Sequence, residues 1–306
     1  MKIVSLFSGV GGMDLGFKLA GHEIIWANDN WTDAVNTYKL NIGDPIIEGD
    51  IQEVKNTIPN CDIVIGGFPC QGFSVANRNR HKEDIRNQLY LEFVSILEKT
   101  KPPFFLAENV KGILSLDDGI AFEKIVEEFS KIGYNVNHML LNAADYGVPQ
   151  KRERVFIYGV RKDYNYDLKM PPAKTHSCNL DEGLNSWVTV GDVLKNVPDP
   201  DKKHALKNHV YSKFKIKWNG YLGHRPVSPN EPSPTITARG DKKGGVVIHP
   251  HPNRKRRMSV REAAIIQSFP LDFEFFGSKT SAYRQIANAV PPKLSFQIAK
   301  QFPDKA

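Results

Sequence analysis

The first 160 residues alternate short apolar runs with helix-like stretches, and this alternation constrains the fold more than any other feature. The apolar runs have the length of buried strands, and the stretches between them have the 3.6-residue rhythm of helices. Strands spaced by helices predict a parallel sheet with right-handed crossovers, covered on both faces. We therefore predict an α/β fold built on a doubly wound, mostly parallel sheet. The expected strands are Ile3–Phe7, Glu23–Ala27, Ile46–Glu48, Asp62–Gly66, Pro103–Glu108, Val136–Asn142 and Arg154–Val160, and the expected helices are Met13–Ala20, Trp31–Leu40, Asn87–Thr100 and Ile120–Ile132.

The composition and periodicity of the chain change after Arg161. Residues 163–257 are rich in Pro, Asn, Lys and His and hold no long periodic helix, and the run Pro229–Pro234 excludes regular structure over its length. We expect a second, smaller and irregular domain here. Helical texture returns at Ser259–Gln267, where Ser259 and Glu262 have the spacing of a capping box, and again at Pro292–Gln301.

Charge is distributed unevenly along the 306 residues. Residues 1–150 hold 13 Lys and Arg against 20 Asp and Glu, a net charge of −7, and the remainder holds 28 against 14, a net charge of +14. An acidic front half and a basic back half fit catalysis in one part and polyanion binding in the other, although basic halves also occur in proteins that bind no nucleic acid. No apolar run approaches the roughly 18 residues of a membrane span, and the cysteines show neither metal-ligand spacing nor a disulfide framework. These features predict a cytoplasmic protein.

A glycine-rich turn follows the first expected strand. The segment Phe7-Ser-Gly-Val-Gly-Gly12 lets the backbone turn sharply and approach a ligand, although a purely structural turn has the same composition. It is not the dinucleotide fingerprint, because Asp14 stands where the third glycine would be. Asp29 and Asp50 close the next two strands, where carboxylates can accept hydrogen bonds from ribose hydroxyls and an adenine amine. This order favours an adenosine-containing cofactor without a pyrophosphate.

A cysteine lies on a shaped turn after the fourth expected strand. Most lone cysteines are inert packing residues. Cys70 differs because Gly66-Gly-Phe-Pro-Cys-Gln-Gly-Phe-Ser74 places it among glycines and a proline, at the sheet edge where doubly wound proteins do their chemistry. The polar segment Val75–Asn87, which contains Arg78 and Arg80, has the composition of a mobile lid over an anionic ligand.

Two further groups of charged residues lie at strand ends, one where a strand closes and the other where a strand opens. Glu108 ends the fifth expected strand, where it is either a solvated strand end or a general acid whose pKa burial raises. The segment Gln150-Lys-Arg-Glu-Arg154 opens a later strand. Its alternation sends Arg152 and Arg154 to one face, able to hold phosphate or base oxygens.

Five motifs, taken in order, resemble those of the DNA cytosine-5 methyltransferases that use S-adenosylmethionine. The likeness covers roughly residues 1–160 and 257–300 and implies the Rossmann-like methyltransferase fold. The motifs are Phe7-x-Gly-x-Gly-Gly12, Gly67-Phe-Pro-Cys-Gln71, Glu108-Asn-Val110, Gln150-x-Arg-x-Arg154 and Gln285-Ile-Ala-Asn-Ala-Val290.

The resemblance implies a catalytic set of Cys70, Glu108, Arg152 and Arg154. Cys70 as a thiolate would add to carbon 6 of cytosine and make carbon 5 nucleophilic, while Glu108 stabilises the charge at N3. Arg152 and Arg154 would bind the cytosine carbonyl oxygen. The base must leave the double helix to reach the thiolate, so base flipping is implied.

The resemblance also implies a binding site for S-adenosylmethionine. Asn30 stands where relatives often place the residue that packs on adenine, and Trp31 follows it, so Trp31 is the candidate for that contact. The cofactor residues implied are Phe7, Gly9, Gly11, Gly12, Asp29, Asp50, Ile51, Pro69 and Asn288.

By the same resemblance, residues 1–165 and 281–306 form the catalytic domain, and residues 166–280 form a target-recognition domain and hinge. The expected partner is double-stranded DNA, and the expected form is a monomer associated with the nucleoid. The enzyme is expected either to have a cognate restriction endonuclease or to act as a solitary bacterial or phage modification enzyme. Lys202–Lys217 and Arg254–Arg257 suit phosphate contacts, and Thr235–Thr237 with Arg239 could enter a groove.

Three alternatives stay open at this point. The same chemistry could act on transfer RNA, as in one branch of the family. A catalytically silent DNA-binding relative is a second alternative, although such a protein has no need of Cys70, Glu108, Arg152, Arg154 and the glycine turn together. A nicotinamide oxidoreductase is disfavoured by Asp14 within the turn.

Overall fold

The computed structural model describes residues 1–68, 85–179, 183–216, 224–238 and 248–305. For residues 85–88 it describes the backbone alone. Pro69, Cys70, residues 75–84 of the predicted lid and Arg239 therefore lie outside the described residues, whereas residues 85–87 of that segment begin a helix.

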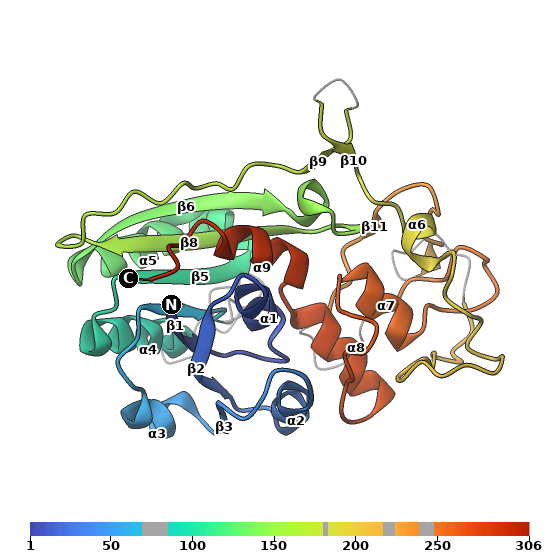
Figure 1. Cartoon of the computed structure of the whole chain (residues 1–306), viewed down its shortest axis with the longest axis horizontal. Helices are drawn as coiled ribbons and strands as arrows, with labels where there is room; N and C mark the ends of the chain where they lie inside the picture. The colour runs from blue at the N-terminus through green and yellow to red at the C-terminus, as the bar shows by residue number, and fades with distance from the viewer. Residues whose placement is uncertain (69–84, 180–182, 217–223, 239–247, 306) are drawn as a thin grey trace.

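Seven strands form one sheet in the order β3-β2-β1-β4-β5-β8-β6 (Figure 1). Every neighbouring pair is parallel except the pairs that β8 makes with β5 and β6. The predicted doubly wound, mostly parallel sheet is confirmed, and β8 enters it as an antiparallel strand between β5 and β6. The strands are β1 Lys2–Leu6, β2 Glu23–Asp29, β3 Ile46–Glu48, β4 Ile63–Gly66, β5 Phe104–Val110, β6 Tyr134–Asn142 and β8 Glu153–Arg161.

Helices cover both faces of the sheet because successive strand residues point to opposite sides. Ile3 belongs to one core with residues of α1 and α9, and its neighbour Val4 belongs to another core with residues of α4 and α5. The helices of the front half are α1 Gly12–Leu19, α2 Thr32–Asn41, α3 Ile51–Val54, α4 Ile85–Thr100 and α5 Ile120–Lys131, with short 3-10 turns η1 Lys55–Thr57, η3 Lys111–Gly119 and η4 Ala143–Tyr146.

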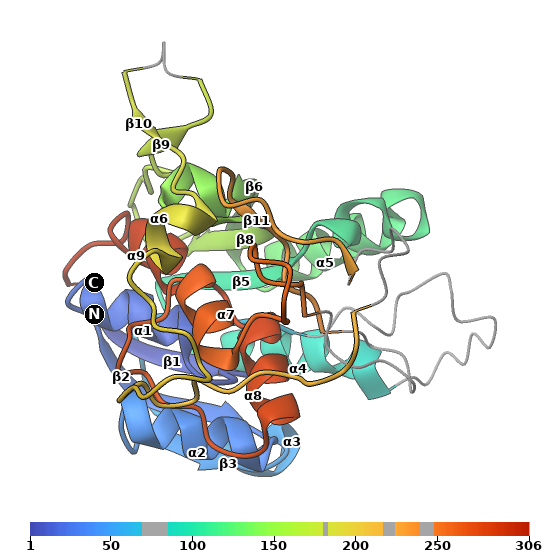
Figure 2. The same cartoon turned by 90° about the vertical axis from the view of Figure 1, so that its right-hand side faces the viewer.

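Three helices close the chain: α7 Val260–Ile266, α8 Lys279–Asn288 and α9 Pro292–Ala299. The capping box predicted at Ser259 and Glu262 is present at the start of α7. Helix α8 was not predicted, since its sequence is mostly polar; it is held by a third core that it shares with α2 and α7. Figure 2 faces the end of the molecule where α6, α7 and α8 gather.

The region between β8 and α7 is largely irregular, as predicted, but the run Pro229–Pro234 does include regular structure, because Ser233–Pro234 forms a short strand. It holds α6 Val190–Leu194 and the two-residue strands β9 His176–Ser177, β10 Asn185–Ser186 and β11 Ser233–Pro234. Strand β11 pairs with β7 Gln150–Lys151. The irregular region is therefore hydrogen-bonded to the segment that immediately precedes β8. The predicted domain boundary at residue 281 falls within α8. In the part of the chain that the structure describes, no helix is long and apolar enough to cross a membrane.

Candidate active site

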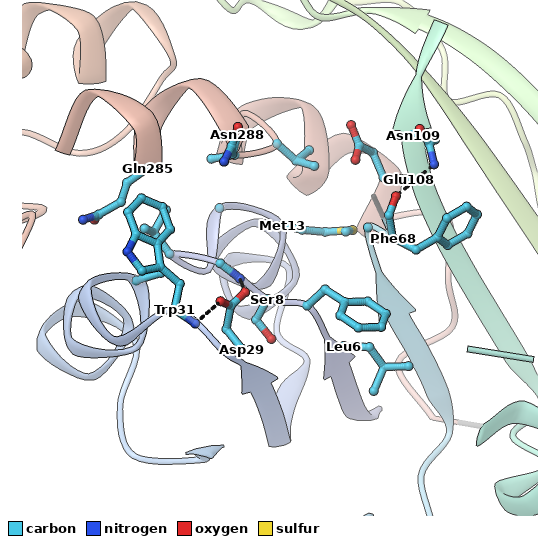
Figure 3. A pocket seen from close by; sticks show the side chains of 18 of the residues that line it. Leu6, Ser8, Met13, Asp29, Trp31, Phe68, Glu108, Asn109, Gln285 and Asn288 are labelled. Atoms are coloured by element: carbon cyan, nitrogen blue, oxygen red, sulfur yellow. Dashed lines mark hydrogen bonds between the residues drawn. The ribbon is translucent and has the colours of Figure 1, made fainter. Parts of the chain in front are cut away.

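One cavity of about 1060 Å³ opens at the carboxyl ends of β1, β2, β4 and β5. Parallel strands end at a common sheet edge, and this edge is where open α/β sheets bind ligands. Figure 3 shows Asp29 and Trp31 at one end of the cavity, Glu108 at the other, and Asn288 on the side of α8. The predicted site residues that line it are Phe7, Gly9, Gly12, Asp29, Asp50, Ile51, Glu108, Arg152, Arg154 and Asn288.

The glycine turn forms the floor of the cavity and requires its glycines. Gly9 has φ +56° and open space around its Cβ position, so its backbone can approach a ligand closely. A Cβ on Gly12 would lie 2.4 Å from the Val290 carbonyl oxygen, so α1 packs against the α8–α9 connection only with glycine there. Gly11 has φ +78°, and its Cβ position faces Tyr38 rather than the cavity.

Asp29 fixes the end of β2 to this turn. Its carboxylate accepts hydrogen bonds from the backbone N–H groups of Gly9 at 2.8 Å and Trp31 at 2.9 Å. Burial raises the pKa of Asp29, and these backbone bonds oppose the rise. Asp50 caps α3 through a bond from the backbone N–H of Gln52, with its side chain on the cavity wall. Two carboxylates here suit hydroxyl and amine donors and would repel a pyrophosphate.

Asp14 is a buried carboxylate beneath the turn that the sequence did not mark as a site residue. It accepts hydrogen bonds from the Ser5 hydroxyl at 2.8 Å and the Tyr38 hydroxyl at 2.7 Å. Burial raises the pKa of Asp14 to about 6, against these two bonds. Asp14 thus ties α1 to β1 and α2 at the base of the cavity.

Glu108 and Arg154 form a largely buried ion pair at the opposite end. Arg154 Nε lies 2.9 Å from Glu108 Oε1, and each side chain is only 12% exposed. Burial raises the pKa of Glu108, while the nearby Arg154 and Arg152 guanidinium groups lower it. A Cβ on Gly67 would lie 3.0 Å from Glu108 Oε2, so the chain passes close to this carboxylate on its way to Cys70.

The residue after Glu108 anchors the entry to the cysteine turn. Asn109 donates its side-chain amide to the Phe68 carbonyl oxygen at 3.0 Å, and both residues are buried (Figure 3). Phe68 is the last described residue before Pro69 and Cys70. The backbone is therefore held beside Glu108 two residues before the cysteine.

Arg152 and Arg154 reach the same cavity, as the alternation predicts, but their partners differ. The Arg152 guanidinium donates to the carbonyl oxygens of Ile236, Ala287 and Ala289 at 2.8–3.1 Å. Its terminal nitrogens are therefore committed to backbone groups. Arg154 instead pairs with the carboxylate of Glu108, two residues before the end of β5.

Trp31 lines the cavity beside Asp29, and the Arg284 guanidinium carbon lies 4.8 Å from the centre of its ring. This is the geometry of a cation–π contact between α8 and the end of β2. Arg284, Thr237 and Ala238 also line the cavity, and of these only Thr237 was predicted. Arg284 directly precedes the motif Gln285–Val290, which could have pointed to it, whereas no motif marks Ala238.

A Gly-rich turn, strand-end carboxylates and a buried Glu–Arg pair at one sheet edge define an enzyme with the α/β methyltransferase architecture. The family model for C-5 cytosine-specific DNA methylases matches residues 1–304. The chain belongs to this family and is a DNA (cytosine-5)-methyltransferase, which confirms the resemblance inferred from its motifs.

Curated relatives and solved structures agree with this assignment. The type II methyltransferase M.NgoFVII of Neisseria gonorrhoeae is 41% identical over 98% of this chain and 85% of its own length. M.MthTI of Methanothermobacter thermautotrophicus is 37% identical, covering 98% of this chain and 96% of that protein. The S. pombe Dnmt2 methyltransferase structure superposes with a TM-score of 0.69 at 21% identity, covering 98% of this chain and 97% of that one, and shows the shared fold.

Proposed function

We propose that this protein transfers a methyl group from S-adenosylmethionine to carbon 5 of a cytosine flipped out of a specific duplex DNA site, through a covalent bond to Cys70. The observation that carries the proposal is the position of the Glu108–Arg154 pair. It shares one cavity with the glycine turn and Asp29, and it lies beside the backbone that leads into Cys70.

The residues at the β1–β2 end fit the cofactor. Asp29 and Asp50 offer acceptors for the ribose hydroxyls and the adenine amine, and Trp31 offers an aromatic face. The open backbone at Gly9 suits close approach of the amino-acid portion, with Asn288 on the opposite wall. When bound, S-adenosylmethionine supplies an electrophilic methyl group on a positively charged sulfur.

Cys70 supplies the nucleophile that activates cytosine. Its thiolate forms a bond to carbon 6 as the carbon 5–carbon 6 double bond opens, and the electron pair becomes available at carbon 5. After carbon 5 is methylated, its proton leaves to a base or water, the double bond re-forms, and the thiolate departs. The thiolate is thereby regenerated.

Glu108 and Arg154 hold the ring during this addition. Negative charge from the thiolate spreads to N3 and the carbonyl oxygen of cytosine, and Glu108, with its raised pKa, can give N3 a proton or hydrogen bond. Arg154 is placed to orient Glu108 and to bind the carbonyl oxygen. The terminal nitrogens of Arg152 bind backbone carbonyls, which leaves its buried Nε, without a partner in the described structure, as the atom that could contact the base.

We infer that the substrate is double-stranded DNA and that the enzyme belongs to a restriction–modification system with a cognate endonuclease. The two curated relatives described above, at 41% and 37% identity, are named type II methyltransferases. Residues 166–280, the region we assign to target recognition, hold 19 Lys and Arg against 11 Asp and Glu, and this excess of 8 positive charges favours phosphate contacts. A cytosine in a duplex can enter a cavity this deep only by base flipping.

Transfer of tritiated methyl groups tests the proposal directly. The purified chain is incubated with labelled S-adenosylmethionine and with duplex DNA or transfer RNA, and the label is followed to 5-methylcytosine. Label in DNA and not in transfer RNA is expected. Label in transfer RNA alone would replace the substrate, and no label on either, with DNA still bound, would indicate a silent relative.

A further inference from the structure

A line of buried amide groups joins the late irregular region to the end of α8. The backbone N–H of Ile236 donates to Gln150 Oε1 at 3.1 Å, and Gln150 Nε2 donates to Gln267 Oε1 at 2.5 Å. Gln267 Nε2 then donates to the carbonyl oxygens of Ala289 at 2.7 Å and Ile286 at 3.2 Å. Four segments, at residues 236, 150, 267 and 286–289, are thus connected in series.

Arg152 makes a second connection between the same two ends. It donates to the carbonyl oxygen of Ile236 and to those of Ala287 and Ala289. Both backbone groups of Ile236 are therefore held, one by Gln150 and the other by Arg152. The guanidinium also lies at the carboxyl end of α8, where the helix dipole favours a positive charge. We call Gln150, Arg152 and Gln267 the interdomain latch.

The latch is shielded from water. Gln150 and Gln267 have no exposed surface, and Arg152 is 1% exposed. Breaking one bond here leaves a polar group buried without a partner, which is costly, and bonds in a chain reinforce one another. Displacement of one connected segment alone is therefore unfavourable, and the segments move together or not at all.

Each end of the latch continues into a wall of the active-site cavity. Thr237 and Ala238 follow Ile236 and line the cavity from the proposed recognition region. Asn288 lies between the two latched residues Ala287 and Ala289 and lines the cavity from the cofactor side. The buried bonds of the latch thus fix the cavity wall at Thr237 and Ala238 and also the cavity wall at Asn288.

We propose that the latch residues are positioning residues that couple cofactor binding to DNA binding. This rests on the proposed function. A cofactor that orders the α8–α9 connection also orders segment 235–238, and DNA that orders segment 235–238 also orders the cofactor wall. By linkage the two effects are reciprocal, so each ligand tightens the other by the same factor.

The test is the coupling factor, measured as the dissociation constant of S-adenosylhomocysteine without DNA divided by that with saturating duplex. The duplex carries the site that bisulfite sequencing finds methylated on a plasmid treated with wild-type enzyme. We expect a factor of at least about 5 in the wild type, the lower end of typical couplings. Gln267→Leu, which keeps the volume and removes the amide but leaves the Arg152 connection in place, should lower the factor by at least about twofold.

Gln285→Leu is the matched control. Gln285, on α8, is a buried glutamine like Gln267. Its amide bonds Thr37, Ser281 and Phe276 and does not reach segment 235–238. It lines the cavity, so cofactor affinity itself can change, but the coupling factor should stay at the wild-type value. Thermal unfolding of both variants checks that they are folded.

A folded Gln267→Leu variant with wild-type coupling would overturn the latch, and so would a wild type with a factor of 1. Hydrogen exchange on the wild type gives a second readout that needs no variant. S-adenosylhomocysteine alone should slow exchange of the Ile236 amide, and unchanged exchange would also count against the latch. Methyl transfer by the wild type is measured in parallel, so failure of the proposed function is seen separately.

Discussion

Glu108 and Arg154 come from neighbouring antiparallel strands and meet on one face of the sheet. Arg154 lies opposite Val110 in the ladder between β5 and β8, two residues from Glu108, and its Nε reaches Glu108 Oε1 at 2.9 Å. Diagonal neighbours on one face are within reach of long side chains. Because β8 runs antiparallel to β5, the start of β8 comes beside the end of β5, which brings the two proposed catalytic groups together.

The pair predicts how the rate depends on pH. Replacing Glu108 with Gln should lower the rate of methyl transfer by about 10²–10⁴-fold, the usual contribution of a general acid. The protonated form of Glu108 is the donor and burial raises its pKa, so the wild-type single-turnover rate should fall as pH rises through that pKa. The single-turnover rate of Glu108→Gln should not show this fall with pH.

Glu153→Gln is the control for that experiment. Glu153 is a neighbour on β8 that pairs with Lys111 at 3.0 Å with its side chain 46% exposed. Its replacement should leave the methyl-transfer rate, and the way that rate falls with pH, close to those of the wild type. A Glu108→Gln variant with a wild-type rate would remove Glu108 from the chemistry.

The proposed covalent step predicts a trapped complex. On duplex DNA carrying 5-fluorocytosine, the adduct cannot lose a proton from carbon 5, so a complex stable in denaturing gels should form and map to Cys70. Cys70→Ser should lose this complex and most methyl transfer while still binding S-adenosylhomocysteine and DNA. Cys178→Ser should behave as the wild type, because Cys178 is an exposed free thiol.

Mapping of the adduct to another cysteine would refute the assignment. Cys61 is the less suitable alternative, since burial, followed by the charge of Asp62, raises the pKa of its thiol to about 12. Such a thiol is almost entirely protonated at neutral pH and is a poor nucleophile.

Asp14 should make the protein less stable as pH rises. Its pKa is about 6 in the folded protein against an ordinary 3.8, so the folded state holds the proton more tightly than the unfolded state. This contribution to the free energy of unfolding is fully present below about pH 4 and is lost as pH rises through 6, a change of about 3 kcal/mol.

Asp14→Asn isolates that contribution. Its amide can keep partners at both Ser5 and Tyr38 without carrying a charge, so the variant should gain stability over the wild type as pH rises from 4 to 7. Urea unfolding at several pH values measures the difference between the two proteins. A difference that does not vary with pH would show that Asp14 does not titrate in this range.

The glycine turn predicts a matched pair of alanine variants. Gly12→Ala places a Cβ 2.4 Å from the Val290 carbonyl oxygen, a backbone atom that cannot turn away, so α1 and the α8–α9 connection must separate. We expect a loss of about 1–3 kcal/mol of stability and weaker binding of S-adenosylhomocysteine. Gly112→Ala, with nothing within 4 Å of its Cβ position, should have little effect on either in calorimetry.

Local sequence was sufficient for the sheet and for the edge where the site forms. The ends of β1, β2 and β5, at Leu6, Asp29 and Val110, were predicted within two residues, because buried strands are short apolar runs. Parallel strands share a carboxyl edge, so residues at these ends had to meet there once the sheet was assigned. The motif resemblance added the family, which the comparisons confirm.

Tertiary structure decided what each charged group in that site contacts. Arg152 and Arg154 share one face by alternation, yet one binds three backbone carbonyls and the other a carboxylate, because their neighbours come from residues 236, 287–289 and 108. Helix α8 lacked a predictive pattern because its stability comes from the core it shares with α2 and α7. Side-chain periodicity follows from a residue's own segment, whereas partners, burial and pKa depend on segments that only the folded chain brings together.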